Sequence, residues 1–254
     1  MKNALNIFCL CFSAFVFAQE KVVVEYEFYN VFDLSKETNP KMLEMLKNSN
    51  ENKTYYELVT SEEESQYKKI DRIDNSQSKK GIMISFGGPG EDFYKNFKED
   101  ISLTYMDYNG TKLIIKDSLK VQPWVIQRDK STYLGYDVKK ATYTDKDNLV
   151  YTAWYAPKLA IKNGPVEYAG LPGLILKLEI VDTDERGGEN KRIYNATDIK
   201  IDPKAKITRP TKGKVISEAE FTEMIKEENR KFEEMYGNKV ETKSMVQGNV
   251  VLAF

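Results

Sequence analysis

The strongest constraint on the fold is an apolar run that follows a Pro-Gly pair late in the chain. Pro172 presets φ for the second position of a turn, and Gly173 can adopt the positive φ that the third position of a type II turn requires. Residues 174–180, which come next, are apolar on both faces at first and on one face afterwards. This pattern predicts a turn that leads directly into a strand deep inside a sheet.

Several short motifs around this run resemble those of a known family. They are Tyr133-Leu134-Gly135-Tyr136, Lys140-Ala141-Thr142, Ala153-Trp154-Tyr155, Gly164-Pro165 and Gly170-Leu171-Pro172-Gly173-Leu174-Ile175. On these residues the chain resembles the GLPGLI family, uncharacterised secreted proteins of Gram-negative envelopes. The resemblance names a family and implies no substrate. Family members often carry a Cys after the Gly-Tyr pair, where this chain has Asp137-Val138, so a disulfide found in relatives is not expected here.

Residues 1–18 have the three parts of a secretory signal peptide. Lys2 supplies the positive start, residues 5–16 form a short apolar core, and Val16-Phe17-Ala18 fits the small residues before a cleavage site. We therefore expect export to the periplasm or the outer-membrane periphery of a Gram-negative bacterium, with residues 19–254 as one domain. Nothing after Ala18 approaches the roughly 18 continuous apolar residues of a membrane-spanning helix, so an integral membrane protein is not expected.

The composition narrows the chemistry that the chain can perform. It has no His, and cleavage after residue 18 would remove both Cys, which excludes Ser-His-Asp triads, Cys-His nucleophiles, and zinc or haem sites built on His. No cofactor and no metal site are expected. The 38 basic and 39 acidic residues are mixed throughout, which argues against a nucleic-acid partner. Acidic residues are widespread, so a carboxylate-dependent hydrolase is kept as an alternative.

One motif match is interpreted as coincidence. Ser65-Gln66-Tyr67-Lys68 fits the S-x-x-K pattern of Ser-Lys hydrolases, in which the Lys lies one helical turn from the Ser. The match lies in a polar stretch without the motifs that accompany it in those enzymes. No catalytic residue is therefore predicted.

Strand patterns recur along the chain with turn signals between them. Alternation begins at residues 22–28, and Asn109-Gly110 is the strongest two-residue hairpin signal. Residues 55–70 are polar and acidic, which suggests two strands at a solvated edge of the sheet. Further strands are expected at residues 81–86, 101–105, 124–126, 133–143, 149–155 and 191–201. This spacing predicts an antiparallel meander.

Two segments have helical patterns. Asn39-Pro40 opens a short helix over residues 41–47, and Ser217 with Glu220 forms a capping box for a helix that ends near residue 236. The apolar face of the second helix consists of Phe221, Met224, Ile225, Phe232, Met235 and Tyr236. That face needs a partner, and we expect it to cover the strand at residues 174–180.

The predicted fold class is therefore α+β. It has a curved, mostly antiparallel sheet, either a meander or a half-barrel, with one long C-terminal amphipathic helix and a short N-terminal helix.

The candidate binding residues are aromatic residues on strands and the residues of the Pro-Gly turn. Trp124, Trp154 and Tyr155 either fill the core or line an apolar groove. The turn residues either serve backbone geometry alone or form a rigid rim that contacts cargo or a partner; they are Gly170, Leu171, Pro172, Gly173 and Leu174.

These features lead to two hypotheses about function. The preferred one is a non-enzymatic periplasmic binding or carrier module, with a groove between sheet and helix for an apolar small molecule, a lipid or a peptide. The link to secreted carriers is an analogy of architecture. The alternative is a protein-interaction module that docks on an outer-membrane protein through the rigid turn.

Overall fold

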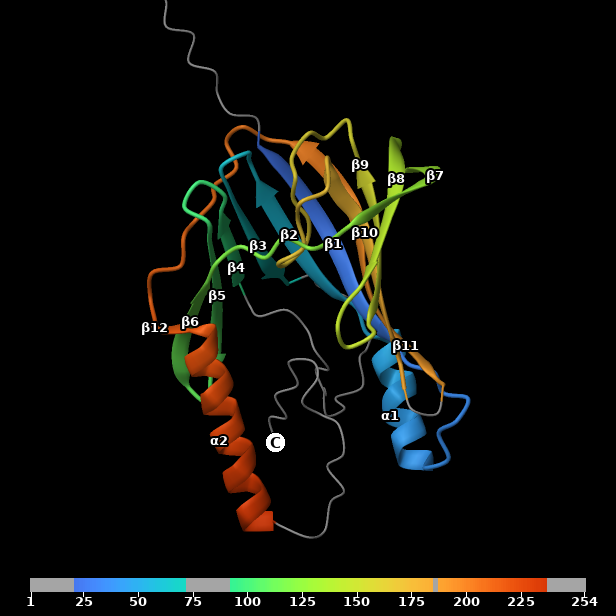
Figure 1. The fold of residues 1–254 in the computed structure, drawn as a ribbon, viewed down its shortest axis with the longest axis vertical. Helices are drawn as coiled ribbons and strands as arrows, with labels where there is room; N and C mark the ends of the chain where they lie inside the picture. Colours follow the sequence, from blue (N-terminus) through green and yellow to red (C-terminus); the bar gives the residue numbers. More distant parts are fainter. Residues whose placement is uncertain (1–20, 72–91, 185–186, 237–254) are drawn as a thin grey trace, which may run out of the picture.

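A computed structural model describes residues 21–71, 92–184 and 187–236. The expected signal peptide and the strand expected at residues 81–86 lie outside these ranges. The described part contains one 12-stranded sheet and two helices, which agrees with the α+β class (Figure 1). The elements are β1 Val22–Val31, α1 Pro40–Glu51, β2 Thr54–Thr60, β3 Glu64–Ile70, β4 Asp92–Asn96, β5 Ile101–Tyr108, β6 Thr111–Asp117, β7 Val125–Tyr133, β8 Tyr136–Thr144, β9 Val150–Ala156, β10 Leu174–Thr183, β11 Glu189–Ile201, β12 Lys214–Ser217 and α2 Glu218–Tyr236.

The sheet consists of two antiparallel meanders joined side by side. Its strand order is β12-β6-β5-β4-β3-β2-β1-β11-β10-β9-β8-β7. The first meander runs from β1 to β6 and the second from β7 to β11, and they meet along the antiparallel β1–β11 pair. The expected antiparallel sheet is therefore confirmed. One edge strand, β12, pairs in parallel with β6 and was not predicted, because four residues are too few to show an alternating pattern.

The prediction of a solvated edge for residues 55–70 is wrong. Strands β2 and β3 lie in the middle of the sheet, between β1 and β4. Residues 202–213 cross the outer face of this region, and there the backbone N–H of Thr208 donates to the side-chain oxygen of Gln66 at 3.0 Å. Gln66 on β3 can be buried because the backbone of Thr208, far away in the chain, satisfies its side-chain oxygen.

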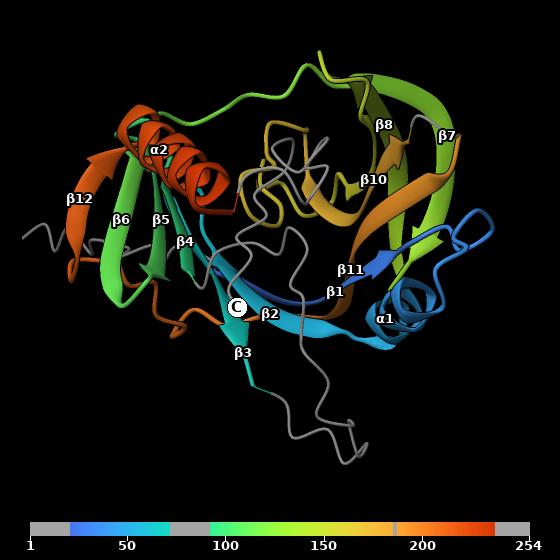
Figure 2. The same cartoon turned by 90° about the horizontal axis from the view of Figure 1, so that it is seen from below.

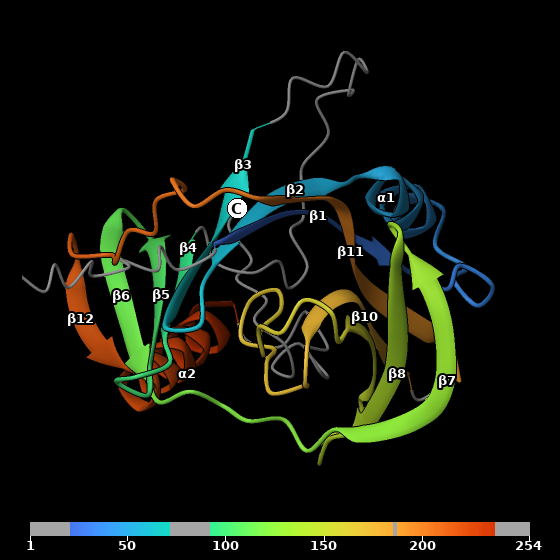
Figure 3. The same ribbon diagram turned by 90° about the horizontal axis from the view of Figure 1, so that it is seen from above.

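The sheet curves strongly, and the chain's own connections fill and close the curve (Figures 2 and 3). Residues 157–173, which connect β9 to β10, lie inside the curve, and we call them the inner segment. Residues 118–124, which connect β6 to β7, cross its open side, and we call them the bridging segment. Helix α2 lies on the same concave side, at the opposite end of the sheet from β7 and β8.

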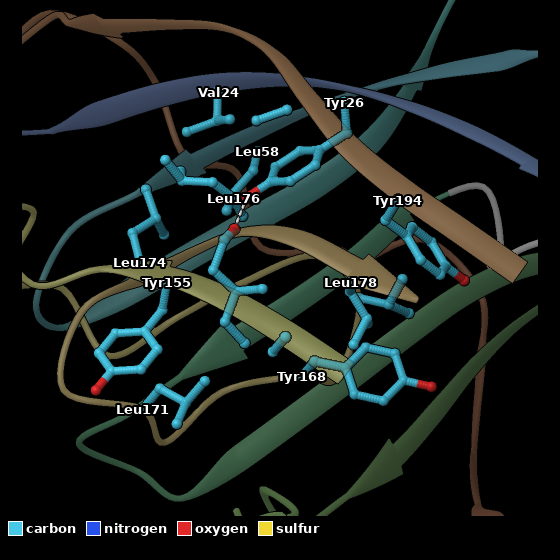
Figure 4. Close-up of a cluster of buried hydrophobic side chains, with 14 of the residues drawn as sticks. Val24, Tyr26, Leu58, Tyr155, Tyr168, Leu171, Leu174, Leu176, Leu178 and Tyr194 are labelled. Atoms are coloured by element: carbon cyan, nitrogen blue, oxygen red, sulfur yellow. Dashed lines mark hydrogen bonds between the residues drawn. The ribbon is translucent and has the colours of Figure 1, made fainter. Parts of the chain in front are cut away.

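The main core forms between β10 and the inner segment. The five apolar residues at the start of β10 are 1% exposed or less, which confirms the deep strand predicted from the Pro-Gly turn (Figure 4); they are Leu174, Ile175, Leu176, Leu178 and Ile180. The inner segment contributes Leu159, Val166, Tyr168 and Leu171 to the same cluster. The chain therefore covers its most apolar strand with the loop that leads into it.

The expectation that α2 covers β10 is wrong. The first half of α2 packs instead against a separate cluster on β5, β6 and β12, through Phe221, Met224 and Ile225. The other residues of the expected apolar face, Phe232, Met235 and Tyr236, lie outside the described side chains. The position over β10 is already occupied by the inner segment, so the helix packs at the far end of the sheet.

Local signals for helix starts and hairpins are confirmed. The N–H of Ser217 donates to the Glu220 carboxylate at 2.7 Å, and the N–H of Glu220 donates to Ser217 Oγ at 3.1 Å, which is the reciprocal pair of a capping box. Asn109 and Gly110 both have positive φ, 51° and 77°, as a two-residue hairpin turn requires.

Replacing Leu178 with Ala should cost about 2–5 kcal/mol of the free energy of unfolding, because it leaves a cavity in the main core. Its neighbour Glu179 points to the opposite face of β10 and is only half-buried. Glu179→Ala is the control, with an expected change of about 0.5 kcal/mol or less. Urea unfolding measures both, and equal costs would contradict this assignment of the two faces.

Candidate functional site

The Pro-Gly turn has a different geometry from the one expected. The N–H of Gly173 donates to the carbonyl oxygen of Leu171 at 2.8 Å, which makes a three-residue turn centred on Pro172. A type II turn would bring the Leu174 N–H to that carbonyl, but this N–H donates to Leu159 O at 3.0 Å. The prediction of a type II turn is therefore wrong, because the Leu174 N–H bonds to the inner segment instead of to the Leu171 carbonyl oxygen.

Glycine is nevertheless required at position 173. Its φ is +151°, and a Cβ there would lie 2.4 Å from the carbonyl oxygen of Ala156 and 2.9 Å from Cα of Pro157. The backbone of the turn thus packs directly on the end of β9. Of the other predicted rim residues, Leu171 and Leu174 are buried in the core, whereas Gly170 and Pro172 are exposed. Only these last two could contact a partner directly.

Trp124 ties the bridging segment to the inner segment. Its indole N–H donates to the carbonyl oxygen of Ala169 at 2.9 Å, and Gln122 accepts from the N–H of the same residue at 3.0 Å. The indole ring packs edge-on against Tyr143, with ring centroids 4.7 Å apart. Trp124 therefore holds the inner segment in place.

The two other predicted aromatic residues do not share a groove with Trp124. Trp154 is half-buried, and its partners across the sheet are Lys140 and Lys177. Its neighbour Tyr155 is 1% exposed and points to the other face, because side chains alternate along a strand. Tyr155 thus belongs to the main core cluster, and Trp124 and Trp154 pack against that cluster as partly buried residues.

The fully buried Lys95 holds the inner segment through hydrogen bonds to its backbone. The ammonium group of Lys95, on β4, donates to the carbonyl oxygens of Gly164 at 3.3 Å and Tyr168 at 3.4 Å. Burial lowers the pKa of Lys95 to about 7, and the negative charge of Glu167 offsets part of that effect. Two backbone carbonyls thus satisfy a group that is partly charged near neutral pH.

Ser65 lies beside Lys95 and not beside Lys68, the lysine of its S-x-x-K motif. Ser65 and Lys95 are direct partners in the β3–β4 pair and are both fully buried. Lys68, three residues along the same strand, points to the other face and pairs with Glu57 at 3.5 Å. The interpretation of S-x-x-K as coincidence therefore agrees with the strand geometry.

A hollow opens at the β7–β8 edge of the sheet, next to the start of the inner segment. Its volume is 540 Å³, and its lining consists of Lys130, Ser131, Thr132, Asp137, Val138, Lys139, Pro157 and Lys158. Pro157 is also the residue against which Gly173 packs. The Pro-Gly turn and the hollow therefore both adjoin Pro157.

The hollow lies at the end of a row of residues that crosses four strands. Lys130 on β7 pairs with Lys139 on β8, Lys139 with Tyr155 on β9, and Tyr155 with Ile175 on β10. The row is apolar in the core and cationic at the edge. Tyr155, a predicted binding residue, thus lies one strand behind the hollow.

Sequence reasoning missed the three lysines of the hollow. Leu134 and Gly135 have φ of 48° and 78° and form a two-residue turn between β7 and β8. With this turn in place, pairing of Tyr133 with Tyr136 brings Lys130 opposite Lys139. The prediction of one strand over residues 133–143 hid the turn, because leucine rarely adopts positive φ.

Within residues 21–71, 92–184 and 187–236, no three His, Cys, Asp or Glu side chains gather where they could hold a metal ion. Over the same ranges, no helix has the length and apolar character needed to cross a membrane.

The fold can be described as an α+β protein with a curved, mostly antiparallel sheet, an inner segment that lies inside the curve, and a hollow at the sheet edge. The family model described as "Protein of unknown function (Porph_ging)" matches residues 103–177, a stretch that includes the bridging segment, the hollow and the Pro-Gly turn. None of the curated proteins matches the sequence.

Three solved structures resemble the fold. PNGF-II, in one of its two crystal forms, is 19% identical with a TM-score of 0.52, over 81% of this chain and 33% of that one. This likeness concerns the fold alone, and the chain spans about a third of the length of PNGF-II. An uncharacterised conserved protein from Thermus thermophilus has 8% identity and a TM-score of 0.37, covering 79% and 91% of the two chains. A LolA superfamily protein from Nitrosomonas europaea has 10% identity and a TM-score of 0.31, covering 75% and 88%.

Gly173→Ala should destabilise the protein by at least about 3 kcal/mol, because positive φ strains the new residue and its Cβ meets the Ala156 carbonyl. Gly110→Ala is the matched control, since Gly110 also has positive φ but open space around it. Its expected cost is about 1 kcal/mol. Denaturant unfolding compares the two, and similar costs would show that the close approach to Ala156 is absent.

The free energy of unfolding should rise between pH 7 and pH 9, because Lys95 is buried and has a lowered pKa in the folded protein. The pKa of Lys95 is about 7 in the folded protein, against an ordinary 10.5, so the unfolded chain binds more protons in this window. The expected gain is about 2 kcal/mol. Lys95→Met should remove it, whereas Lys69→Met, at an exposed site on the adjacent strand, should keep it. An unchanged slope in Lys95→Met would refute the shift.

Proposed function

We propose that the chain is a non-enzymatic binding or carrier module of the cell envelope, which holds an apolar small molecule, a lipid or a peptide in the edge hollow. The hollow is the observation that carries this proposal. Its 540 Å³ falls within the range of about 300–1,000 Å³ that is usual for ligand sites. Pro157 and the lysine stems supply apolar surface beside the hydroxyl group of Thr132.

The site differs from the groove that the sequence suggested between sheet and helix. In the described part of the chain, the first half of α2 contacts the sheet directly, and the inner segment fills the concave face over β10. The start of the inner segment forms part of the lining at Pro157, and it is held by the close approach of Gly173 and by the hydrogen bond from the Leu174 N–H to the Leu159 carbonyl oxygen. A wall fixed in this way favours binding, because little ordering is needed when the ligand enters.

The chemistry of the lining supports binding over catalysis. Hydrolysis by paired carboxylates needs two acidic side chains in one cleft. The hollow contains a single carboxylate, Asp137, which forms an ion pair with Lys158 at 3.3 Å. The absence of His from the whole sequence removes the commonest general base.

The signal-peptide pattern of residues 1–18 supports export to the periplasm or the outer-membrane periphery. The Gly-Leu-Pro-Gly-Leu-Ile motif at residues 170–175 supports a place in the GLPGLI family.

A protein-interaction module is the second candidate, and the edge strand β7 favours it. Val125 and Ile126, at its start, are 59% and 52% exposed. An edge strand also offers unpaired backbone N–H and C=O groups to a strand of another protein. An outer-membrane protein would dock on this strand.

Thr132→Trp should abolish ligand binding by filling the hollow. Thr132 is exposed, so the variant should remain folded. Native mass spectrometry of protein isolated from the envelope without detergent should show an added mass in the wild type and none in this variant. Thr111→Trp, at an exposed site on β6, is the control and should keep the mass. Equal masses in all three proteins, bound or empty, would contradict the proposal.

A further inference from the structure

Two lysines face each other in the hollow without an acidic partner. Lys130 and Lys139 are direct partners in the β7–β8 pair, so their side chains leave the sheet on the same face, with Cβ atoms about 5 Å apart. Like charges in this arrangement destabilise a strand pair. Over the described ranges neither lysine takes part in an ion pair, so nothing in this part of the chain compensates the repulsion.

The remaining charges of the hollow cancel each other. Lys158 lies 3.3 Å from the carboxylate of Asp137, which leaves Lys130 and Lys139 as the uncompensated pair. Thr132 lies on the same face of β7 as Lys130, and its hydroxyl group can donate a hydrogen bond. Two positive charges with a hydroxyl donor nearby suit a compact dianion with several acceptor oxygens.

The backbone of β7 departs from regular pairing just before this site. The register shifts between Ile126 and Lys130, where β7 has more residues than β8 opposite. Irregular pairing of this kind bends a strand and redirects its side chains, and it is frequent beside functional sites. Here it sets the direction of the strand that carries Lys130.

We propose that the hollow binds a phosphate group between the ammonium groups of Lys130 and Lys139. A phosphate monoester carries about −1.5 to −2 charges at neutral pH, which matches the two lysines. Pro157 and the apolar stems of the lysines also line the hollow and would contact the rest of an amphiphile. The same chemistry is offered by the head group of an amphiphile and by free phosphate. The amphiphile case rests on the proposed function.

Isothermal titration calorimetry with three probes tests this inference on the mature protein. The probes are dodecyl phosphate below its micelle concentration, inorganic phosphate, and the neutral amphiphile dodecyl maltoside. Dodecyl phosphate should bind the wild type, and its affinity should fall at least tenfold in K130Q/K139Q. The control is K146Q/K200Q, which removes the same charge at two exposed lysines outside the hollow and should bind as the wild type does.

A second measurement shows whether the variant is folded. Because K130Q/K139Q removes a repulsion, its melting temperature without ligand should be equal to or above that of the wild type. Added phosphate probe should raise the melting temperature of the wild type and of K146Q/K200Q only. A lower melting temperature of the ligand-free K130Q/K139Q would overturn the claim that the lysines repel each other.

The outcomes separate this inference from the proposed function. Equal binding of dodecyl maltoside and dodecyl phosphate, unchanged in K130Q/K139Q, would overturn the phosphate site and leave the binding module intact. Binding of inorganic phosphate that depends on the lysines, with no gain from the dodecyl chain, would support the phosphate site and count against an apolar ligand. No binding of any probe would overturn the phosphate site and count against a lipid-like ligand, while the native mass spectrometry above tests the binding module itself.

Discussion

The carbonyl oxygen of Ala156 lies 2.4 Å from the place that a Cβ of residue 173 would occupy, and the rest of the interior depends on this approach. It brings the end of β9 against the start of β10 and turns the connection between them back into the curve of the sheet. The backbone N–H groups of Leu174 and Ile175 then donate to Leu159 and Asn163 of the inner segment. A side chain at residue 173 would push these elements apart.

The inner segment takes the role that a helix plays in many α+β proteins. It covers the apolar strand with Leu159, Val166, Tyr168 and Leu171, and polar side chains from distant strands hold its backbone. Lys95 reaches it from β4, Trp124 from the bridging segment, and Thr60 accepts a hydrogen bond from Asn163 at 2.9 Å. These contacts hold residues 163–169, whereas the start of the segment, which lines the hollow, is held by the hydrogen bond from the Leu174 N–H to the Leu159 carbonyl oxygen. The proposed site thus lies against a rigid core.

The local parts of the fold could be predicted because their signals lie within a few residues of each other. The capping box at Ser217 and the turn at Asn109-Gly110 depend only on neighbouring backbone groups. The position of β2 and β3, the packing of α2 and the site at the β7–β8 edge depend on partners far away in the chain. Of the predicted site residues, Tyr155 and Gly173 lie just behind the hollow, whereas Trp154 points to the opposite face.

By itself, the sequence determined that residues 174–180 form a buried strand, because apolar alternation is a local property of the chain. It placed glycine at position 173 for a type II turn, whereas the structure requires glycine there because the backbone of Ala156 lies so close. It also determined that His chemistry is absent. Only the tertiary structure decided what covers that strand and which polar side chains meet. Lys95 donates a hydrogen bond to Gly164 because of the strand order, and Lys130 lies opposite Lys139 because of the register that the turn at Leu134 sets. Neither the strand order nor a leucine with positive φ leaves a periodic pattern in the sequence.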